Sequence, residues 1–174
     1  MIYLAYGLTA VNYLLYCLSR YMKQKKYMLL LDIGAKTVTT ISFLLLGSKT
    51  GMFNMLLAAA LLVFNYFYET KECITKKYNK IVFGIAVLIY CSILAFTYED
   101  VTSILVFITS IISLTSNQFF PPQKMRVTGM FNSIIYLSYQ ILLKNWAGLL
   151  EVLVIISNST AWFKYRKSEN ETKN

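Results

Sequence analysis

The chain has 174 residues and a formal net charge of +9, and hydrophobic residues make up 57% of it against only 14% charged residues. Soluble domains hold about 45–50% apolar and about 25% charged residues. A soluble protein of 20.0 kDa cannot bury so much apolar surface, because a large part of a small fold stays exposed. The composition therefore excludes an ordinary soluble domain and predicts an all-α membrane protein.

The residue inventory also argues against several classes of enzyme. The chain has no histidine, so it lacks the commonest metal ligand and the side chain that exchanges protons near neutral pH. Its three cysteines, Cys17, Cys73 and Cys91, are far apart and form no CxxC pair. The sequence has no dinucleotide-binding, P-loop, zinc-protease or serine-hydrolase motif. We therefore expect no metal, no cofactor and no enzymatic activity.

Seven apolar runs follow one another along the chain, separated by short basic or polar segments. Each run has roughly 17–20 residues, which is about the length needed to cross ~30 Å of hydrocarbon. The first run has no basic segment before it, so we expect a retained span rather than a cleaved signal peptide. The predicted spans are 2–18, 28–47, 51–68, 81–98, 101–119, 127–143 and 147–163.

Basic residues are concentrated in every second connection between the spans. The loops after the first, third and fifth spans, with the tail after the seventh, hold 14 of the 17 Lys and Arg residues. Short loops rich in Lys and Arg stay in the cytoplasm, so we expect the N-terminus outside and the C-terminus inside. These charges also attract anionic lipid heads, so the lipid bilayer, and not nucleic acid, is the expected partner. The first and fifth loops contribute Arg20, Lys23, Lys25, Lys26, Lys124 and Arg126.

Two parts of the chain are similar at an offset of 97 residues. Residues 44–51 align with residues 141–148, and each segment is an apolar helix end followed by a short turn and a glycine. Upstream, Ser19 aligns with Ser116. Spans one to three therefore repeat as spans five to seven, and the single span between them gives both units the same orientation. The alternative is chance, since any two apolar triplets align at some offset.

The repeat predicts seven transmembrane helices arranged as two parallel three-helix units joined by a linker helix, as in SWEETs. The expected parts are a first unit at 1–80, a linker helix at 81–100, a second unit at 101–167 and a polar cytoplasmic tail at 168–174. Bundles of this plan can self-associate, so a homo-oligomer is an open alternative to a monomer.

The second half resembles a known family in its motifs. Residues 144–148 read Lys-Asn-Trp-Ala-Gly, Glu151 and Asn158 follow in the last span, and residues 163–166 form an aromatic and basic cluster. This pattern is similar to the C-terminal end of the YgjV-type bacterial inner-membrane proteins, which implies a location in the bacterial inner membrane. In the third span the family pattern has an Asn followed by an Arg, whereas residues 55–61 have neither.

A looser resemblance extends to SWEET, PQ-loop and vitamin-transporter proteins. Residues 116–119, followed by Lys124, are similar to the start of their repeat, which has a small residue, a polar–aromatic pair and a basic residue. Pro122 and Gln123 form a literal PQ pair. Because Pro121 precedes them at a predicted membrane edge, a turn that ends the fifth span is the alternative explanation.

Polar residues inside the spans are the candidate site, because they are costly in a bilayer and usually face the bundle interior or water. Asp32 and Lys36 lie four residues apart, on one helical face. Their opposite charges predict an ion pair within the helix. The alternative is that both side chains line a cavity.

Four further polar residues complete the candidate site. Glu151 and Asn54 each lie three residues after a glycine and are matched by the offset of 97, so we expect them to face each other across the repeat axis. Asn158 lies two helical turns beyond Glu151, and Asn132 aligns with the residue before Lys36. For Glu151 and Asn54 the alternative is contact with the outer interface; for Asn158 and Asn132 it is hydrogen bonding between helices.

These features favour a carrier or facilitator for a small polar solute. Its two three-helix units would rock against each other around a site near the midplane, giving alternating access. The alternative is a membrane-embedded interaction protein, such as an immunity, sensor or assembly subunit, in which the same polar residues serve folding and contacts. A carrier needs a continuous polar path through the bundle, whereas a scaffold needs only isolated polar patches.

Overall fold

The chain folds into long helices, as the composition predicts. The computed structural model describes residues 2–46, 49–70, 76–98, 100–142 and 146–171, and no strand occurs in these ranges. Cys73, Lys144 and Asn145 lie outside the described residues. The helices are α1 (Ile2–Arg20), α2 (Lys25–Leu46), α3 (Lys49–Thr70), α4 (Lys76–Thr97), α5 (Val101–Phe119), α6 (Pro122–Leu142), the 3-10 helix η1 (Trp146–Leu150) and α7 (Glu151–Glu171).

Turn chemistry explains where α5 begins and ends. Asp100 is its N-cap, and the carboxylate accepts a hydrogen bond from the backbone N–H of Thr102 at 2.8 Å. The Thr102 hydroxyl also donates to this carboxylate and holds the pKa of Asp100 below its ordinary value. At the other end Pro121 follows the extended cap residue Phe120, and Pro122 is the first residue of α6. The PQ pair therefore lies at a helix start, after the turn that ends α5.

Five of the described helices are long and apolar enough to cross a membrane: α2, α3, α4, α5, and α7 with the 3-10 turn before it. α1 and α6 are not among the five. For α6 the reason for its lower apolarity is its polar residues. Its first two turns hold Gln123, Lys124 and Arg126, and Asn132 and Gln140 follow further along the helix. The prediction of seven spans is thus supported for five helices by their apolarity.

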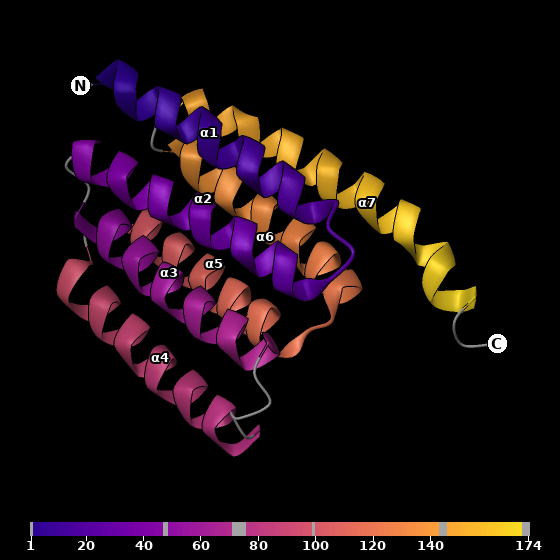
Figure 1. Ribbon diagram of the computed structural model, residues 1–174. Helices are drawn as coiled ribbons and strands as arrows, with labels where there is room; N and C mark the ends of the chain where they lie inside the picture. The colour runs from indigo at the N-terminus through magenta and orange to yellow at the C-terminus, as the bar shows by residue number, and fades with distance from the viewer. Residues whose placement is uncertain (1, 47–48, 71–75, 99, 143–145, 172–174) are drawn as a thin grey trace.

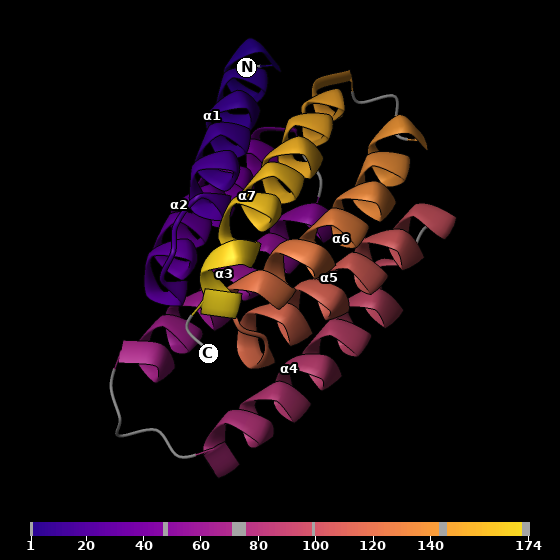
Figure 2. The ribbon, with the colours of Figure 1, turned by 90° about the vertical axis from the view of Figure 1, so that its right-hand side faces the viewer.

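Six helices form a closed ring, and α4 lies outside it. α1 packs on α2 and α2 on α3, while α5 packs on α6 and α6 on α7. The ring closes through contacts of α1 with α7 and of α3 with α5. Figure 1 shows α1 beside α7 and α3 beside α5, with α4 at the edge of the bundle against α3 and α5; Figure 2 shows the same arrangement from the side.

The two ends of the chain lie at opposite ends of the bundle (Figure 1). We call the end that holds the start of α1 the N-terminal end, and the end that holds the last turns of α7 the C-terminal end. Large apolar side chains point outward along the bundle, among them Leu14, Leu88, Phe96 and Phe131, each at least 60% exposed. Such an outer surface suits lipid tails, and it leaves the polar side chains to the interior.

Gly148 fixes how closely η1 approaches α6. A Cβ atom at this position would lie 2.3 Å from Cβ and 2.5 Å from Cγ of Gln140, which is far below van der Waals contact. These atoms are next to the α6 backbone, so the Gln140 side chain cannot rotate away from them. The glycine of the Trp-Ala-Gly motif is therefore required by the close approach of two chain segments.

We predict that Gly148→Ala destabilises the protein by about 1–3 kcal/mol, the usual cost of overpacking an interior. Gly84→Ala is the matched control, because nothing lies within 4 Å of a Cβ at Gly84 and alanine is the better helix former. Thermal unfolding of the two purified variants in detergent tests this. A Gly148→Ala melting temperature equal to that of Gly84→Ala would contradict the packing argument.

Candidate functional site

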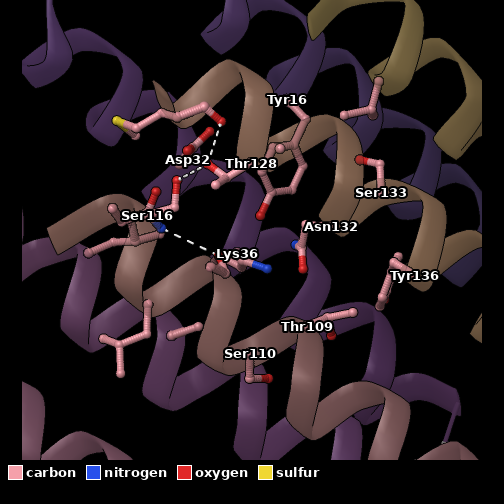
Figure 3. Close-up of a pocket in the computed structure, with 18 of the residues that line it drawn as sticks. Tyr16, Asp32, Lys36, Thr109, Ser110, Ser116, Thr128, Asn132, Ser133 and Tyr136 are labelled. Carbon is pink, nitrogen blue, oxygen red and sulfur yellow. Dashed lines mark hydrogen bonds between the residues drawn. The ribbon is translucent and has the colours of Figure 1, made fainter. Parts of the chain in front are cut away.

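A polar cavity of about 100 Å³ lies inside the bundle, and residues of all seven helices line it. One buried water needs only about 10–15 Å³ of such space, so the cavity can hold several waters or one small solute. Figure 3 shows Tyr16, Asp32 and Lys36 from the first half of the chain on one side, with Asn132, Ser133 and Tyr136 of α6 on the other. Five of the six predicted site residues line this cavity: Asp32, Lys36, Asn132, Glu151 and Asn158.

Asp32 pairs with Arg20, not with Lys36. Nη2 of Arg20 donates to Oδ2 of Asp32 at 2.5 Å, and the two side chains are only 8% and 2% exposed. The expected ion pair between Asp32 and Lys36 was therefore wrong in its partner. A spacing of four residues places two side chains on one face of α2, but Arg20 at the end of α1 reaches the carboxylate first. Both Asp32 and Lys36 lie on the wall of the cavity.

Lys36 enters the cavity from α2 without an ion-pair partner in the described part of the chain. Its Nζ lies 3.4 Å from the sulfur of Met55 and 5.4 Å from the ring centre of Tyr16. Arg20 lies over the same Tyr16 ring, with 5.6 Å from Cζ to the ring centre. Figure 3 shows Lys36 and Asn132 extending into the same space. Sulfur and a ring face stabilise a cation only weakly, so the ammonium keeps most of its hydrogen-bonding capacity.

Glu151 is the first residue of α7 and is buried, with 7% of its surface exposed. Gly148 lets the η1 turn before Glu151 pack closely against α6. The carboxylate therefore lies in the interior of the bundle instead of at the membrane surface. The hydroxyls of Ser133 and Tyr13 hydrogen-bond to it. The positive end of the α7 helix dipole adds a favourable field. Two neutral donors and a helix start hold this carboxylate without a cation in contact.

Four asparagine side chains give the cavity its hydrogen-bonding character. The Oδ1 atoms of Asn12, Asn65, Asn132 and Asn158 are buried and accept no hydrogen bond. For Asn158 the orientation is fixed, because Nδ2 donates to the Val154 carbonyl at 3.0 Å and Oδ1 is left free. Oδ1 of Asp32 and Nε of Arg20 are also buried without partners. A buried polar atom without a hydrogen-bond partner is costly, so six such atoms around one cavity favour the binding of water or a polar solute there.

Asn54 is the predicted site residue that the structure keeps apart from this cavity. It is buried at 5% exposure, but α3 lines the cavity with Met55, Ala58, Leu61, Leu62 and Asn65. Met55 occupies the wall near Lys36, where an asparagine was expected. The pairing of Asn54 with Glu151 across the cavity was therefore wrong. The amide that α3 supplies is Asn65, three turns further along the helix.

Arg126 holds the C-terminal end of the bundle together. It is only 1% exposed and donates to the carbonyls of Arg20 at 2.9 Å and Met22 at 2.8 Å, and to Oε1 of Gln123 at 2.9 Å. The Tyr165 ring of α7 lies against it, 4.6 Å from Cζ to the ring centre. We call this set the Arg126 clasp. Arg20 and Arg126, which were expected in connecting loops, lie in helices instead and bind buried acceptors.

A second, smaller cavity leads from the main one toward the N-terminal end. It has about 20 Å³, shares Asn12, Thr39 and Tyr136 with the main cavity, and reaches Thr9 and Ser42. The hydroxyls of Thr9 and Ser42 are 3.1 Å apart and join α1 to α2 there. Polar side chains therefore continue from the main cavity toward the N-terminal end.

Many wall positions are related by the offset of 97. The wall uses every fourth residue on α1 and again on α5, and it uses matching faces of α2 and α6. One pair joins α3 to α7. The matched wall pairs are Asn12 and Thr109, Tyr16 and Ser113, Arg20 and Asn117, Asp32 and Gly129, Lys36 and Ser133, Thr39 and Tyr136, and Leu61 and Asn158.

Sequence reasoning missed Asn12, Asn65, Tyr16 and the two arginines. Asn12 and Asn65 carried the same signal as the chosen asparagines, since both lie within predicted apolar spans. Arg20 and Arg126 lay at predicted span ends, where a basic residue normally marks topology, so nothing local distinguished them. Among the described residues no three His, Cys, Asp or Glu side chains gather as a metal site requires.

We predict that Asp32→Asn and Arg20→Gln each destabilise the protein by about 3–5 kcal/mol, because each leaves a buried charge unpaired. The double variant should lose much less than the sum of the two. A second cycle that combines Asp32→Asn with Lys36→Met should show a smaller coupling energy. Unfolding of the purified variants in detergent measures both. Stronger coupling of Asp32 with Lys36 than with Arg20 would contradict the observed pairing.

The comparison with known proteins agrees with this picture. A family model described as a bacterial inner membrane protein, Imp-YgjV, matches residues 3–169. No curated protein and no solved structure matches the chain. This family and the five apolar helices support a multi-pass location in the inner membrane. Because the match covers nearly the whole sequence, the chain belongs to the Imp-YgjV family of bacterial inner membrane proteins.

Proposed function

We propose that the protein carries a small polar solute across the inner membrane by alternating access. The observation that supports this best is the central cavity with six buried, unpartnered polar atoms on its wall. In a packed scaffold such atoms would pair with one another across helices, since an unsatisfied group inside a membrane protein is costly. In a carrier the solute supplies the missing hydrogen-bond partners of these atoms. We expect no chemical step, because binding and release are sufficient for transport.

The moving parts of this carrier are α1–α3 and α5–α7. If the two units are equivalent, α1 corresponds to α5 and α7 corresponds to α3. The contact of α1 with α7 then corresponds to the contact of α5 with α3, and both contacts occur. Two serines related by the offset of 97 each join neighbouring helices. Ser19 of α1 donates to the Met28 carbonyl of α2 at 3.1 Å, and the hydroxyls of Ser116 of α5 and Thr128 of α6 are hydrogen-bonded at 2.7 Å. Together with the wall pairs, these features favour a parallel repeat with α4 as its linker.

The described conformation fits a state with one end closed. At the C-terminal end the Arg126 clasp and the pair of Arg20 with Asp32 join α6 to the end of α1 and the start of α2. At the N-terminal end the second cavity extends the polar wall toward the surface. We infer that rocking of the two units breaks the Arg126 clasp and opens the opposite side.

This mechanism has a defined orientation. All seven long helices cross the membrane, and the polar side chains of α6 are accommodated because they face the cavity or the Arg126 clasp. The bias of basic residues toward the C-terminal end favours a cytoplasmic position for that end and for the C-terminus, with the N-terminus outside. The Arg126 clasp is then the cytoplasmic gate.

We predict that cysteine at Asn132 or Asn158 reacts with a charged, water-soluble thiol reagent from either side of the membrane. The background is a chain in which the three native cysteines are replaced by serine. Only an ionised thiol reacts, so water must reach the position. Intact cells test the outer side and inverted vesicles the inner side.

Matched controls lie two residues away on the same helices. Ile134 and Ile156 are 51% and 52% exposed on the outer face of the bundle, where lipid would cover them, so cysteines there should stay unreactive. Silence of the cavity positions from both sides would favour the packed interaction protein. Reaction from one side only would mean a vestibule and would overturn alternating access.

A further inference from the structure

We propose that the solute is a small zwitterion with a primary ammonium and a carboxylate, of the size of the smallest amino acids; this proposal rests on the proposed function. It follows from how donors and acceptors are distributed over the cavity wall. Among the described residues of the wall, the two charged side chains without an ion-pair partner have opposite signs: Lys36 belongs to the first half of the chain and Glu151 to the second.

The first half of the chain supplies the cationic side. Lys36 has an ammonium with no carboxylate within 4.0 Å in the described part of the chain, and it contacts only a sulfur and a ring face. Nε of Arg20 is buried without an acceptor, although Nη2 of the same guanidinium binds Asp32. A carboxylate of the solute would satisfy both groups with charge-assisted hydrogen bonds.

The second half supplies the anionic side. Glu151 carries a carboxylate held only by neutral hydroxyls, and Asn132 and Asn158 offer free carbonyl oxygens from α6 and α7. Gly129 keeps the last of these in place, because a Cβ there would lie 3.0 Å from Oδ1 of Asn158. One carboxylate and two amide oxygens on this side of the wall are three acceptors, which matches the three N–H bonds of a primary ammonium.

Charge balance excludes the one-charge alternatives. The wall holds two basic side chains, Arg20 and Lys36, and two acidic ones, Asp32 and Glu151, so it has no net charge when all four are ionised. A solute with a single charge would leave an uncompensated charge in a low-dielectric interior, which is costly. A quaternary ammonium has no N–H bond and would leave the asparagine oxygens unsatisfied. The volume of about 100 Å³ has room for about seven to ten water-sized groups, which is enough for an amino acid as small as alanine.

The test is calorimetric titration of the purified, lipid-reconstituted protein with four probes of similar size. They are alanine, ethylamine, propionate and glycine betaine. We expect alanine to bind at least tenfold more tightly than each of the other three. Equal binding of alanine and either one-charge probe, or no binding of alanine, would overturn the zwitterion.

Two variants assign the two ends. Lys36→Met should reduce alanine binding to the level of ethylamine and leave ethylamine binding intact, which also shows that the variant is folded. Glu151→Gln should reduce alanine binding to the level of propionate. The matched controls are Lys80→Met and Glu69→Gln, which change exposed residues away from the cavity and should bind alanine as the parent does. Equal losses in a variant and its control would overturn the assignment.

Failure of this proposal and failure of the carrier are distinguishable. Reactive cysteines at the cavity positions together with no preference for alanine would overturn the zwitterion and keep the carrier. Unreactive cysteines together with a tenfold preference for alanine would overturn transport and leave a zwitterion-binding site.

Discussion

Hydrocarbon offers no hydrogen-bond partner, so the polar side chains of membrane helices must find partners inside the protein. This constraint explains the layout of the bundle. Large apolar side chains such as Leu88 and Phe96 cover the outside, while the charged and amide groups gather at the centre. What differs from a packed bundle is that the central groups do not all satisfy one another. Their incomplete pairing is the feature from which solute binding is inferred.

The polar groups divide into those that hold the bundle and those that are free to act. Arg126 donates hydrogen bonds to backbone carbonyls of α1 and of the loop that follows it, and Arg20 forms an ion pair with Asp32. In the proposed carrier these contacts close one end of the cavity. Lys36 and Glu151 have weak or neutral partners instead, and they come from different halves of the chain. For the proposed carrier we expect that loss of the first group changes the conformation and that changes in the second alter what the cavity binds.

The helices and the membrane class could be predicted from the sequence because long apolar runs and basic connections are strong, local signals. The partners inside the bundle could not. Asp32 and Lys36 share a helical face, yet the partner of Asp32 comes from another helix, which only packing decides. The offset of 97 does not say which side of its helix faces the cavity, so the match of Asn54 with Glu151 did not show that Asn54 is absent from the wall. Arg126 is buried against carbonyl acceptors from segments distant in the sequence, and no local pattern indicates them. From its position at a predicted span end, Arg126 therefore indicated only topology.

The central claim is that two equivalent units rock about the cavity. Labels at Tyr27 and Lys124 lie where α2 and α6 begin, at the C-terminal end of the bundle, and labels at Leu44 and Ile141 lie where they end, at the N-terminal end of the bundle; all four residues are exposed. Pulsed electron-spin resonance measures the distance within each pair. The account predicts two distance populations for each pair, and conditions that lengthen one distance should shorten the other. A single, unchanged distance for both pairs in the reconstituted protein, with and without alanine, would contradict it.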